Sequence, residues 1–360
     1  MNEPKILECT LRDGSYAHNF KFSQEDTYKI CNRLDKLGFE LIEVGHGVGL
    51  DASRKGYGLA EASDIEYMAA ASSAVKTGKW GMFCIPGIAD LSSIKTAAEH
   101  KMDFIRIGCD VDKVDNAAPY IDCARESGMY VFSNLMKSYA CDPKFFAQQA
   151  AKCVSAGAQC IYLVDSAGGM LTSDIDLYTD VLRSAIQDTP LGFHGHHNLG
   201  MGIANSLRCL ELGYTVVDSS LQGFGRSTGN TPTEQLVAVM QRAGYEINLD
   251  PIEVMEAGEE LIRPLITTMG LDSLDVTSGL AQFHSSYMER VITISNQYLV
   301  DPRRVIIELC GIDRINAPEE LVHKCAQTVL ADFGTYVPNQ YKKYFGNEQN
   351  DAAWVSRRLV

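Results

Sequence analysis

Short apolar runs with amphipathic segments between them recur along the first 250 residues. Eight of these runs are rich in β-branched and aromatic residues, which predicts buried strands. The runs cover 5–10, 41–46, 80–85, 104–108, 130–136, 160–165, 191–196 and 216–221. Their spacing of roughly 25–40 residues leaves room for a strand, a helix and two loops. In the segment 23–39, for example, Ser23 and Asp26 predict a capping box at the start of a helix.

Alternation of strand and helix repeated eight times predicts an α/β fold, a TIM (β/α)8 barrel, over residues 1–262. A doubly wound open sheet is the alternative. It would require a glycine fingerprint after the first strand, and "LRDGSYAHNF" contains none.

The pattern changes after about residue 250, where no further strand is predicted. The segments 251–269, 279–298, 302–310 and 317–333 have helical patterns. We therefore expect a C-terminal helical domain over residues 263–345, followed by a mostly polar tail at 346–360.

Composition and charge exclude several classes of protein. The net charge of −14 disfavours binding to a phosphate backbone, so no nucleic-acid partner is expected. No apolar run approaches the ~20 residues of a membrane span, and no signal peptide is visible, so a cytoplasmic location is expected. The 11 cysteines are scattered without a CxxC pair, which favours reduced core thiols over zinc knuckles or disulfides.

Polar residues gather at the carboxyl ends of the predicted strands, where a (β/α)8 barrel has its active site. His194 and His196 lie two apart on the seventh strand, so their side chains point to the same side. Asp13 follows the first strand, which in a closed barrel is separated from the seventh only by the eighth. A carboxylate and two imidazoles suit Mn²⁺, Mg²⁺, Fe²⁺, Co²⁺ or Zn²⁺. The alternative is a pair of core or surface histidines without a metal.

Two further features adjoin this set. Arg12 is a fixed cation that could stabilise an oxyanion, or could simply pair with a neighbouring carboxylate. The loop "GFGRSTGN" lacks the Gly-Lys-Ser/Thr of a phosphate loop, so its glycines are expected to let the backbone pass close to the site.

Several motifs together resemble one known family. The chain resembles the pyruvate-dependent 4-hydroxy-2-oxovalerate aldolases, within the metal-dependent superfamily of 3-hydroxy-3-methylglutaryl-CoA lyase and isopropylmalate synthase. The motifs are "TLRDGS" (10–15), "EVGHGVGL" (43–50), "PGI" (86–88), "YLVDSAGGM" (162–170), "GFHGHHNLG" (192–200) and "GNTPTE" (229–234). The resemblance runs from about residue 5 to about residue 330.

The resemblance implies roles for individual residues. Asp13, His194 and His196 would bind the metal, most readily Mn²⁺. In some relatives the residue matching Asn230 also faces it. Arg12 would steady an enolate, and Ser166 with nearby backbone amides would hold the carboxylate of a 2-oxo acid. The segment 263–290 is similar to a helical region that reaches over the barrel mouth.

The sequence departs from the family pattern at two positions that bear on the catalytic base. The aldolases have a histidine where this chain has Tyr16, and a tyrosine where it has His284. We expect the two to face each other across the substrate, with His284 taking the hydroxyl proton and Tyr16 orienting the substrate. The alternatives are that His284 is structural and that His18, His46 or a metal-bound water is the base.

The implied activity is a class II-type lyase that cleaves a 4-hydroxy-2-oxo acid to pyruvate and an aldehyde. An acyl-CoA/2-oxo acid transferase and an interaction subunit with a vestigial site are the alternatives. A Schiff-base mechanism is disfavoured because the sixth strand ends without a lysine. Relatives pair with an acylating aldehyde dehydrogenase through the C-terminal helices, so such a partner or a homo-oligomer is possible.

Overall fold

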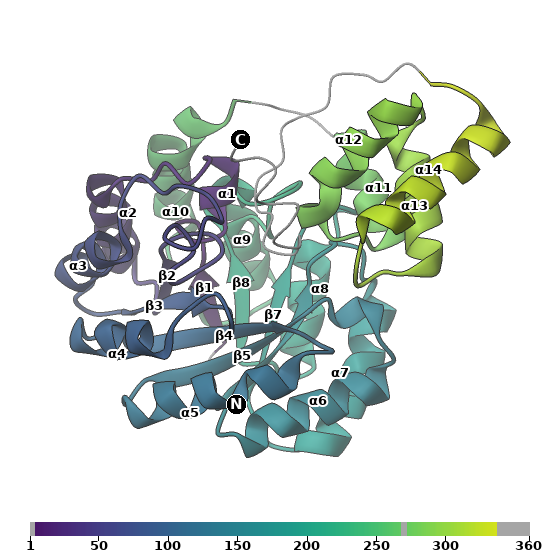
Figure 1. The fold of residues 1–360 in the computed structure, drawn as a ribbon. Helices are drawn as coiled ribbons and strands as arrows, with labels where there is room; N and C mark the ends of the chain where they lie inside the picture. Colours follow the sequence, from purple (N-terminus) through teal and green to yellow (C-terminus); the bar gives the residue numbers. More distant parts are fainter. Residues whose placement is uncertain (1–3, 268–271, 337–360) are drawn as a thin grey trace.

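The main body of the protein is a closed barrel of eight parallel strands, seen in a computed structural model that describes residues 4–267 and 272–336 (Figure 1). Each strand pairs with the next in sequence, and β1 pairs with β8 to close the barrel. The strands are β1 (Lys5–Glu8), β2 (Leu41–Val44), β3 (Lys79–Cys84), β4 (Phe104–Asp110), β5 (Tyr130–Met136), β6 (Cys160–Asp165), β7 (Leu191–Gly195) and β8 (Val216–Ser219). The predicted (β/α)8 barrel is confirmed.

The first strand is two residues shorter than its apolar run predicts. β1 ends at Glu8 because the chain turns immediately afterwards, where the Cys9 carbonyl accepts hydrogen bonds from the backbone N–H groups of Arg12 and Asp13 at 3.1 and 2.8 Å. A short helix, α1 (Gly14–Ala17), follows. This turn places Arg12 and Asp13 at the mouth of the barrel.

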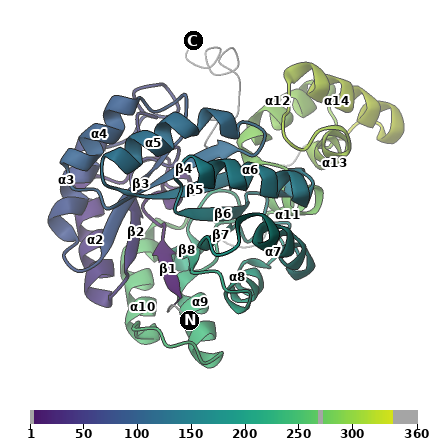
Figure 2. The same ribbon diagram turned by 90° about the horizontal axis from the view of Figure 1, so that it is seen from below.

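Helices surround the strands, as the view along the barrel shows (Figure 2). They are α2 (Gln24–Leu37), α3 (Asp64–Ala74), α4 (Leu91–Glu99), α5 (Ala118–Glu126), α6 (Pro143–Ser155), α7 (Thr172–Ile186), α8 (Gly202–Glu211) and α9 (Thr233–Arg242). The predicted capping box of α2 is present, because Ser23 and Asp26 each accept a hydrogen bond from the other's backbone N–H. No helix in the described ranges is both long and apolar enough to cross a membrane.

The C-terminal region is helical, but two predicted helices are interrupted. The segment predicted as one helix over 251–269 forms α10 (Pro251–Ala257), a π turn (Gly258–Ile262) and a 3₁₀ turn (Arg263–Leu265), and residues 268 and 269 lie outside the described ranges. The predicted helix 279–298 is broken at Gln282, whose φ of 55° is left-handed. The remaining elements are α11 (Ser273–Ala281), η6 (Ser285–Tyr287), α12 (Met288–Tyr298), α13 (Pro302–Ile312) and α14 (Glu319–Phe333).

Helices α11 to α14 have an apolar core of their own, which runs from Leu274 to Val329. They contact the barrel at its mouth, where Asn198 and Ser227 form hydrogen bonds with the backbone and side chain of Asp275 at 2.9 and 2.8 Å. α11 therefore lies against the loops that follow β7 and β8. The domain boundary at residue 262 stays a prediction, and the predicted tail 346–360 lies outside the described ranges.

Candidate metal centre and active site

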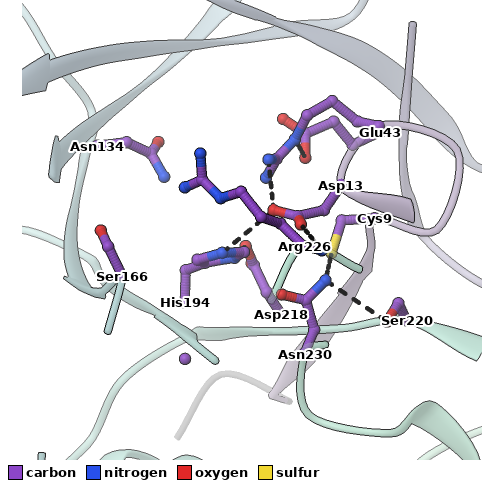
Figure 3. Close-up of polar contacts among 12 residues, drawn as sticks. Cys9, Asp13, Glu43, Asn134, Ser166, His194, Asp218, Ser220, Arg226 and Asn230 are labelled. Atoms are coloured by element: carbon purple, nitrogen blue, oxygen red, sulfur yellow. Dashed lines mark hydrogen bonds and ion pairs between the residues drawn. The ribbon is translucent and has the colours of Figure 1, made fainter. Parts of the chain in front are cut away.

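Asp13, His194 and His196 converge at the mouth of the barrel. Figure 3 shows Asp13 and His194 side by side. One potential ligand atom from each lies within 4.8 Å of the others, and all three side chains are buried. His194 Nε2 is 3.5 Å from Asp13 Oδ2. The side-chain alternation of β7 directs both histidines toward the carboxylate that follows β1.

A buried charge network beneath the cluster orients His194. Its Nδ1 lies 2.8 Å from Asp218 Oδ2, and because a carboxylate only accepts, Nδ1 donates this hydrogen bond and Nε2 is directed toward Asp13. Arg106 bridges Asp218 and Glu43, with N–O distances of 2.5 and 2.8 Å. The sequence analysis missed these three residues. The sequence did contain a feature that could have revealed them, because each of the apolar runs "LIEV", "FIRIG" and "VVDSS" includes one charged residue.

The cluster has the donor chemistry of a divalent-cation site. Burial opposes ionisation of Asp13, but the Arg12 guanidinium holds its pKa well below the usual range, so the carboxylate is charged. Burial lowers the pKa of His196 to about 3, so its imidazole is neutral. Among the described residues, His196 Nδ1 and Asn230 Oδ1 are buried polar atoms without a hydrogen-bond partner. Two imidazoles, an ionised carboxylate and buried polar atoms without a hydrogen-bond partner fit a bound divalent metal.

Cys9, one of the predicted core thiols, lies beside this site. Its Sγ falls within 4.8 Å of ligand atoms of His194 and Asp218. Burial raises the pKa of the thiol well above its ordinary value, and the thiol donates to the Ser219 carbonyl at 3.2 Å. Cys9 is therefore a protonated neighbour of the site, and the ligand set remains one of nitrogen and oxygen. All 11 cysteines are reduced, as expected.

Arg12 pairs with the carboxylates around it, which was the alternative to a role in catalysis. Its Nε donates to Glu43 at 2.8 Å and its Nη1 to Asp13 at 2.6 Å. These contacts hold the guanidinium rigidly beside the metal cluster, and within the described ranges its Nη2 makes no hydrogen bond. The ion pairs and a catalytic role are thus compatible, because Nη2 can donate a further hydrogen bond.

Tyr16 and His284 are brought to the same region, and Arg226 lies between them. The guanidinium carbon of Arg226 is 4.8 Å from the centre of the Tyr16 ring, and Arg226 Nη2 is 3.3 Å from His284 Nε2. The backbone N–H of Arg226 donates to Asp13 Oδ1 at 3.1 Å. The sequence analysis quoted the loop but assigned Arg226 no role. An arginine inside a glycine-rich loop at a barrel mouth was the available signal.

His284 is a buried, neutral histidine. It precedes η6, and its Nδ1 is hydrogen-bonded to Ser286 Oγ at 2.7 Å. Burial, reinforced by the charges of Arg226 and Lys137, lowers its pKa well below 6.5. Because a guanidinium only donates, Nε2 offers its lone pair toward Arg226. This is the nitrogen that can accept a proton.

The other candidate bases are engaged elsewhere. His46 Nδ1 accepts from the Val48 N–H and Nε2 donates to the Gly58 carbonyl, both at 3.1 Å, so both ring nitrogens are used. His18 lies against Phe22 with ring centres 5.2 Å apart, and burial lowers its pKa. Neither histidine contacts the metal cluster.

Ser166 and Asn230 lie at the edge of the site. Ser166 follows β6, and its Oγ accepts from the Lys137 N–H at 3.4 Å. Asn230 forms a β-bridge with His196, and its Nδ2 approaches Cys9 Sγ at 3.7 Å. Figure 3 shows Ser166 and Asn134 on one side of His194 and Asn230 on the other.

The glycines of the β8 loop allow the backbone to pass close to the site, as expected. A Cβ on Gly225 would lie 2.5 Å from Asn230 Nδ2 and 3.2 Å from Asp13 Oδ1. Gly229 has a φ of +108°, and a Cβ there would lie 1.9 Å from the Gly223 carbonyl oxygen. Any side chain at these positions would displace the loop or a metal-site residue.

Two solved structures that are similar to this chain share its barrel. The carboxyl transferase domain of Rhizobium etli pyruvate carboxylase matches 92% of this chain and 60% of its own, with a TM-score of 0.74 and 17% identity. The N-terminal domain of a putative aldolase from Bacteroides vulgatus matches 81% of this chain and 98% of its own, with a TM-score of 0.69 and 22% identity. These matches show the fold.

The sequence comparisons identify the family, which the structural matches do not. The HMGL-like family model matches residues 3–261. A 4-hydroxy-2-oxovalerate aldolase from Carboxydothermus hydrogenoformans is 33% identical over 88% of this chain and 95% of its own length. One from Roseiflexus castenholzii is 35% identical over 86% of this chain and 92% of its own length. The chain therefore belongs to the HMGL-like family, among the 4-hydroxy-2-oxovalerate aldolases.

Proposed function

We propose that this protein is a divalent-metal-dependent aldolase that cleaves a 4-hydroxy-2-oxo acid to pyruvate and an aldehyde. The convergence of Asp13, His194 and His196 beside Arg12 and His284 carries the proposal. Together these residues provide a metal site, a fixed cation and a neutral base at the mouth of the barrel. The names of the relatives support the same reaction.

Each residue has a defined task in this reaction. Asp13, His194 and His196 would hold a divalent cation, most suitably Mn²⁺, which when bound would supply Lewis-acid chemistry at the 2-oxo group. His284 accepts the proton of the C4 hydroxyl, and the electron pair that the O–H bond leaves on oxygen forms the aldehyde carbonyl as the C3–C4 bond breaks. The electrons of that bond generate the enolate of pyruvate, whose oxygen the Arg12 guanidinium stabilises. A proton then returns to C3 and completes pyruvate.

Two further residues bind and orient the substrate. Ser166 and the backbone amides around it accommodate the carboxylate of the 2-oxo acid from the β6 side. Tyr16 packs against Arg226 and turns the C4 hydroxyl toward His284 Nε2. Burial of both side chains limits the access of water to the enolate.

The most direct test is a screen of 4-hydroxy-2-oxo acids with pyruvate detection, in the presence and absence of Mn²⁺. We expect pyruvate from 4-hydroxy-2-oxovalerate or a close analogue, and its loss in Asp13→Asn. Arg125→Met, a change on the exposed face of α5, is the control. The alternative acyl-CoA transferase would instead release free thiol from acyl-CoA and a 2-oxo acid.

The fate of the aldehyde suggests a partner. An acylating aldehyde dehydrogenase bound to the C-terminal helices would receive it, and self-association through the same helices is the alternative. Leu280, Ile312 and Phe333 are more than half exposed on these helices. Sedimentation velocity of the protein alone, and mixed with such a dehydrogenase, would distinguish the two.

A further inference from the structure

Lys137 is a buried lysine that joins the barrel to the C-terminal helices. It directly follows β5, and none of its side chain is exposed. Three acceptors surround its Nζ, namely Asp110 Oδ2 at 3.4 Å, the Tyr287 hydroxyl at 3.1 Å and the Ile315 carbonyl at 2.6 Å. Asp110 ends β4, whereas Tyr287 and Ile315 belong to the C-terminal helical region. One ammonium group therefore bridges the barrel and the helices.

The backbone conformation at Lys137 is unusual for a lysine. Its φ of 58° lies in the left-handed region that favours glycine. Glycine would relax the backbone at this position but would remove the ammonium group. Residues held in such sparsely populated conformations occur often at functional positions, where surrounding contacts maintain them. The contacts of the ammonium group supply that support here.

The bridge holds the segment that carries His284. Tyr287 ends η6, which begins directly after His284, and the Tyr287 N–H donates to the His284 carbonyl at 3.2 Å. The rings of the two residues lie with their centres 6.2 Å apart. The Tyr287 hydroxyl contacts Lys137 Nζ and also donates to the Ile315 carbonyl at 3.0 Å. Fixing Tyr287 in this way limits how far His284 can move from the barrel mouth.

The charge of Lys137 also acts on His284. Burial is the main cause of the lowered pKa of His284, and nearby cations lower it further. The titratable and charged groups that face His284 are Tyr287 in η6, Arg226 in the β8 loop, Lys137 after β5, His196 after β7 and Asp13 after β1. Lys137 therefore helps to keep His284 neutral, which is the form that can accept a proton.

We propose that Lys137 is a positioning residue for the reaction, which holds η6 and thereby fixes His284 over the metal cluster. This inference rests on the proposed role of His284 as the base. A lysine that follows a barrel strand can instead serve as a Schiff-base nucleophile. Full burial and three acceptors around Nζ oppose that use, because the amine would have to leave all of them to reach a carbonyl carbon.

The kinetics of Lys137→Met in the Mn²⁺-loaded protein test the proposal. Since a displacement of about 1 Å can cost on the order of 10²-fold, we expect kcat to fall by about 10- to 100-fold. The dissociation constant for pyruvate should be unchanged, because its proposed ligands lie on the barrel. The acidic limb of the pH–rate profile should move to higher pH, since loss of a neighbouring cation raises the pKa of His284. Lys137→Arg keeps the charge and should keep this limb near its wild-type position.

Two controls separate positioning from general stability. Lys113 is exposed and binds the same Asp110 carboxylate at 3.2 Å, so Lys113→Met should leave kcat and the limb unchanged. Arg290 is a buried cation of α12 that donates to the Ala317 carbonyl, so Arg290→Met should destabilise the same helices without moving the limb. If Lys137→Met keeps the wild-type kcat and limb, or lowers kcat with an unmoved limb as Arg290→Met does, the inference is wrong.

Hydrogen exchange tests the positioning without turnover. Tyr287→Phe removes only the hydroxyl between Lys137 and Ile315, and it serves as the milder variant if Lys137→Met does not fold. We expect the amides of 284–288 to exchange faster in both variants and at the wild-type rate in Lys113→Met. Unchanged exchange in both would overturn the inference.

Two outcomes concern the reaction itself. Faster exchange in these variants, combined with no cleavage of any 4-hydroxy-2-oxo acid by the wild-type protein, would contradict the proposed aldolase activity while supporting the hold of Lys137 on η6. A pyruvyl group attached to Lys137 after borohydride reduction, detected by mass spectrometry, would overturn the inference in favour of a Schiff base.

Discussion

Replacing Arg106 by methionine should cost this protein much of its stability, although Arg106 lies beneath the proposed ligands and contacts none of them. Its side chain is fully buried between Glu43 and Asp218, and its guanidinium carbon lies 4.5 Å from the centre of the Tyr162 ring. Methionine nearly preserves the volume and removes the charge. Two buried carboxylates then lose their shared counter-ion.

The size of the expected destabilisation follows from the loss of this counter-ion. Removing one partner of a buried ion pair destabilises by about 3–5 kcal/mol, because an uncompensated charge remains in the interior. For a protein of 360 residues that corresponds to a fall in Tm of about 4–7 °C, at roughly 1.3 °C per kcal/mol. The pKa of Asp218, which Arg106 now holds below its usual value against the effect of burial, should rise. Proton uptake by Asp218 would limit the cost.

Urea unfolding followed by circular dichroism, with and without Mn²⁺, is the assay. Arg125→Met is the matched control, since Arg125 forms only an exposed pair with Asp122 and should change the free energy of unfolding by less than about 1 kcal/mol. The triple change Arg106→Met with Glu43→Gln and Asp218→Asn should recover part of the loss. If Arg106→Met costs no more than Arg125→Met, the reasoning about the buried network is wrong.

Three further changes test the site itself. Arg12→Ala should lower kcat by about 10²-fold or more, and Arg12→Lys should rescue it poorly; a rise in KM alone would assign Arg12 to substrate binding. His284→Ala should cost at least about 10²-fold and remove the acidic limb of the pH–rate profile. In the wild-type protein that limb should lie below pH 6.5, because burial lowers the pKa of His284; an unchanged limb and rate in the variant would exclude His284 as the base. Gly225→Ala should weaken Mn²⁺ binding, measured by calorimetry, because its Cβ would push against Asn230 and Asp13, and unchanged affinity would show that the loop adapts.

Local sequence signals were sufficient for the barrel and for the metal cluster. The apolar runs are separated by amphipathic helices of regular length, so their number and order indicate a closed parallel sheet. Asp13, His194 and His196 could be grouped because strand alternation and barrel order fix where they point. Only generic rules of barrel geometry were needed for this step.

The remaining features depend on packing between distant parts of the chain. The link between Arg106 and Asp218 joins residues 112 positions apart on β4 and β8, and nothing in either run specifies the partner. The contact between Arg226 and His284 requires the C-terminal helices to lie over the β8 loop. The break near Gln282, which places His284 before η6, arises from a left-handed residue that helical periodicity does not reveal.

The central claim is that Asp13, His194 and His196 bind a divalent metal on which aldol cleavage depends. The decisive measurement is pyruvate release from a 4-hydroxy-2-oxo acid by the chelator-treated protein, before and after addition of Mn²⁺. We expect no release from the treated protein, recovery on addition of Mn²⁺, and no recovery in His196→Ala. Full activity in excess chelator, together with inactivation by borohydride in the presence of pyruvate, would contradict the account and indicate a Schiff-base lysine.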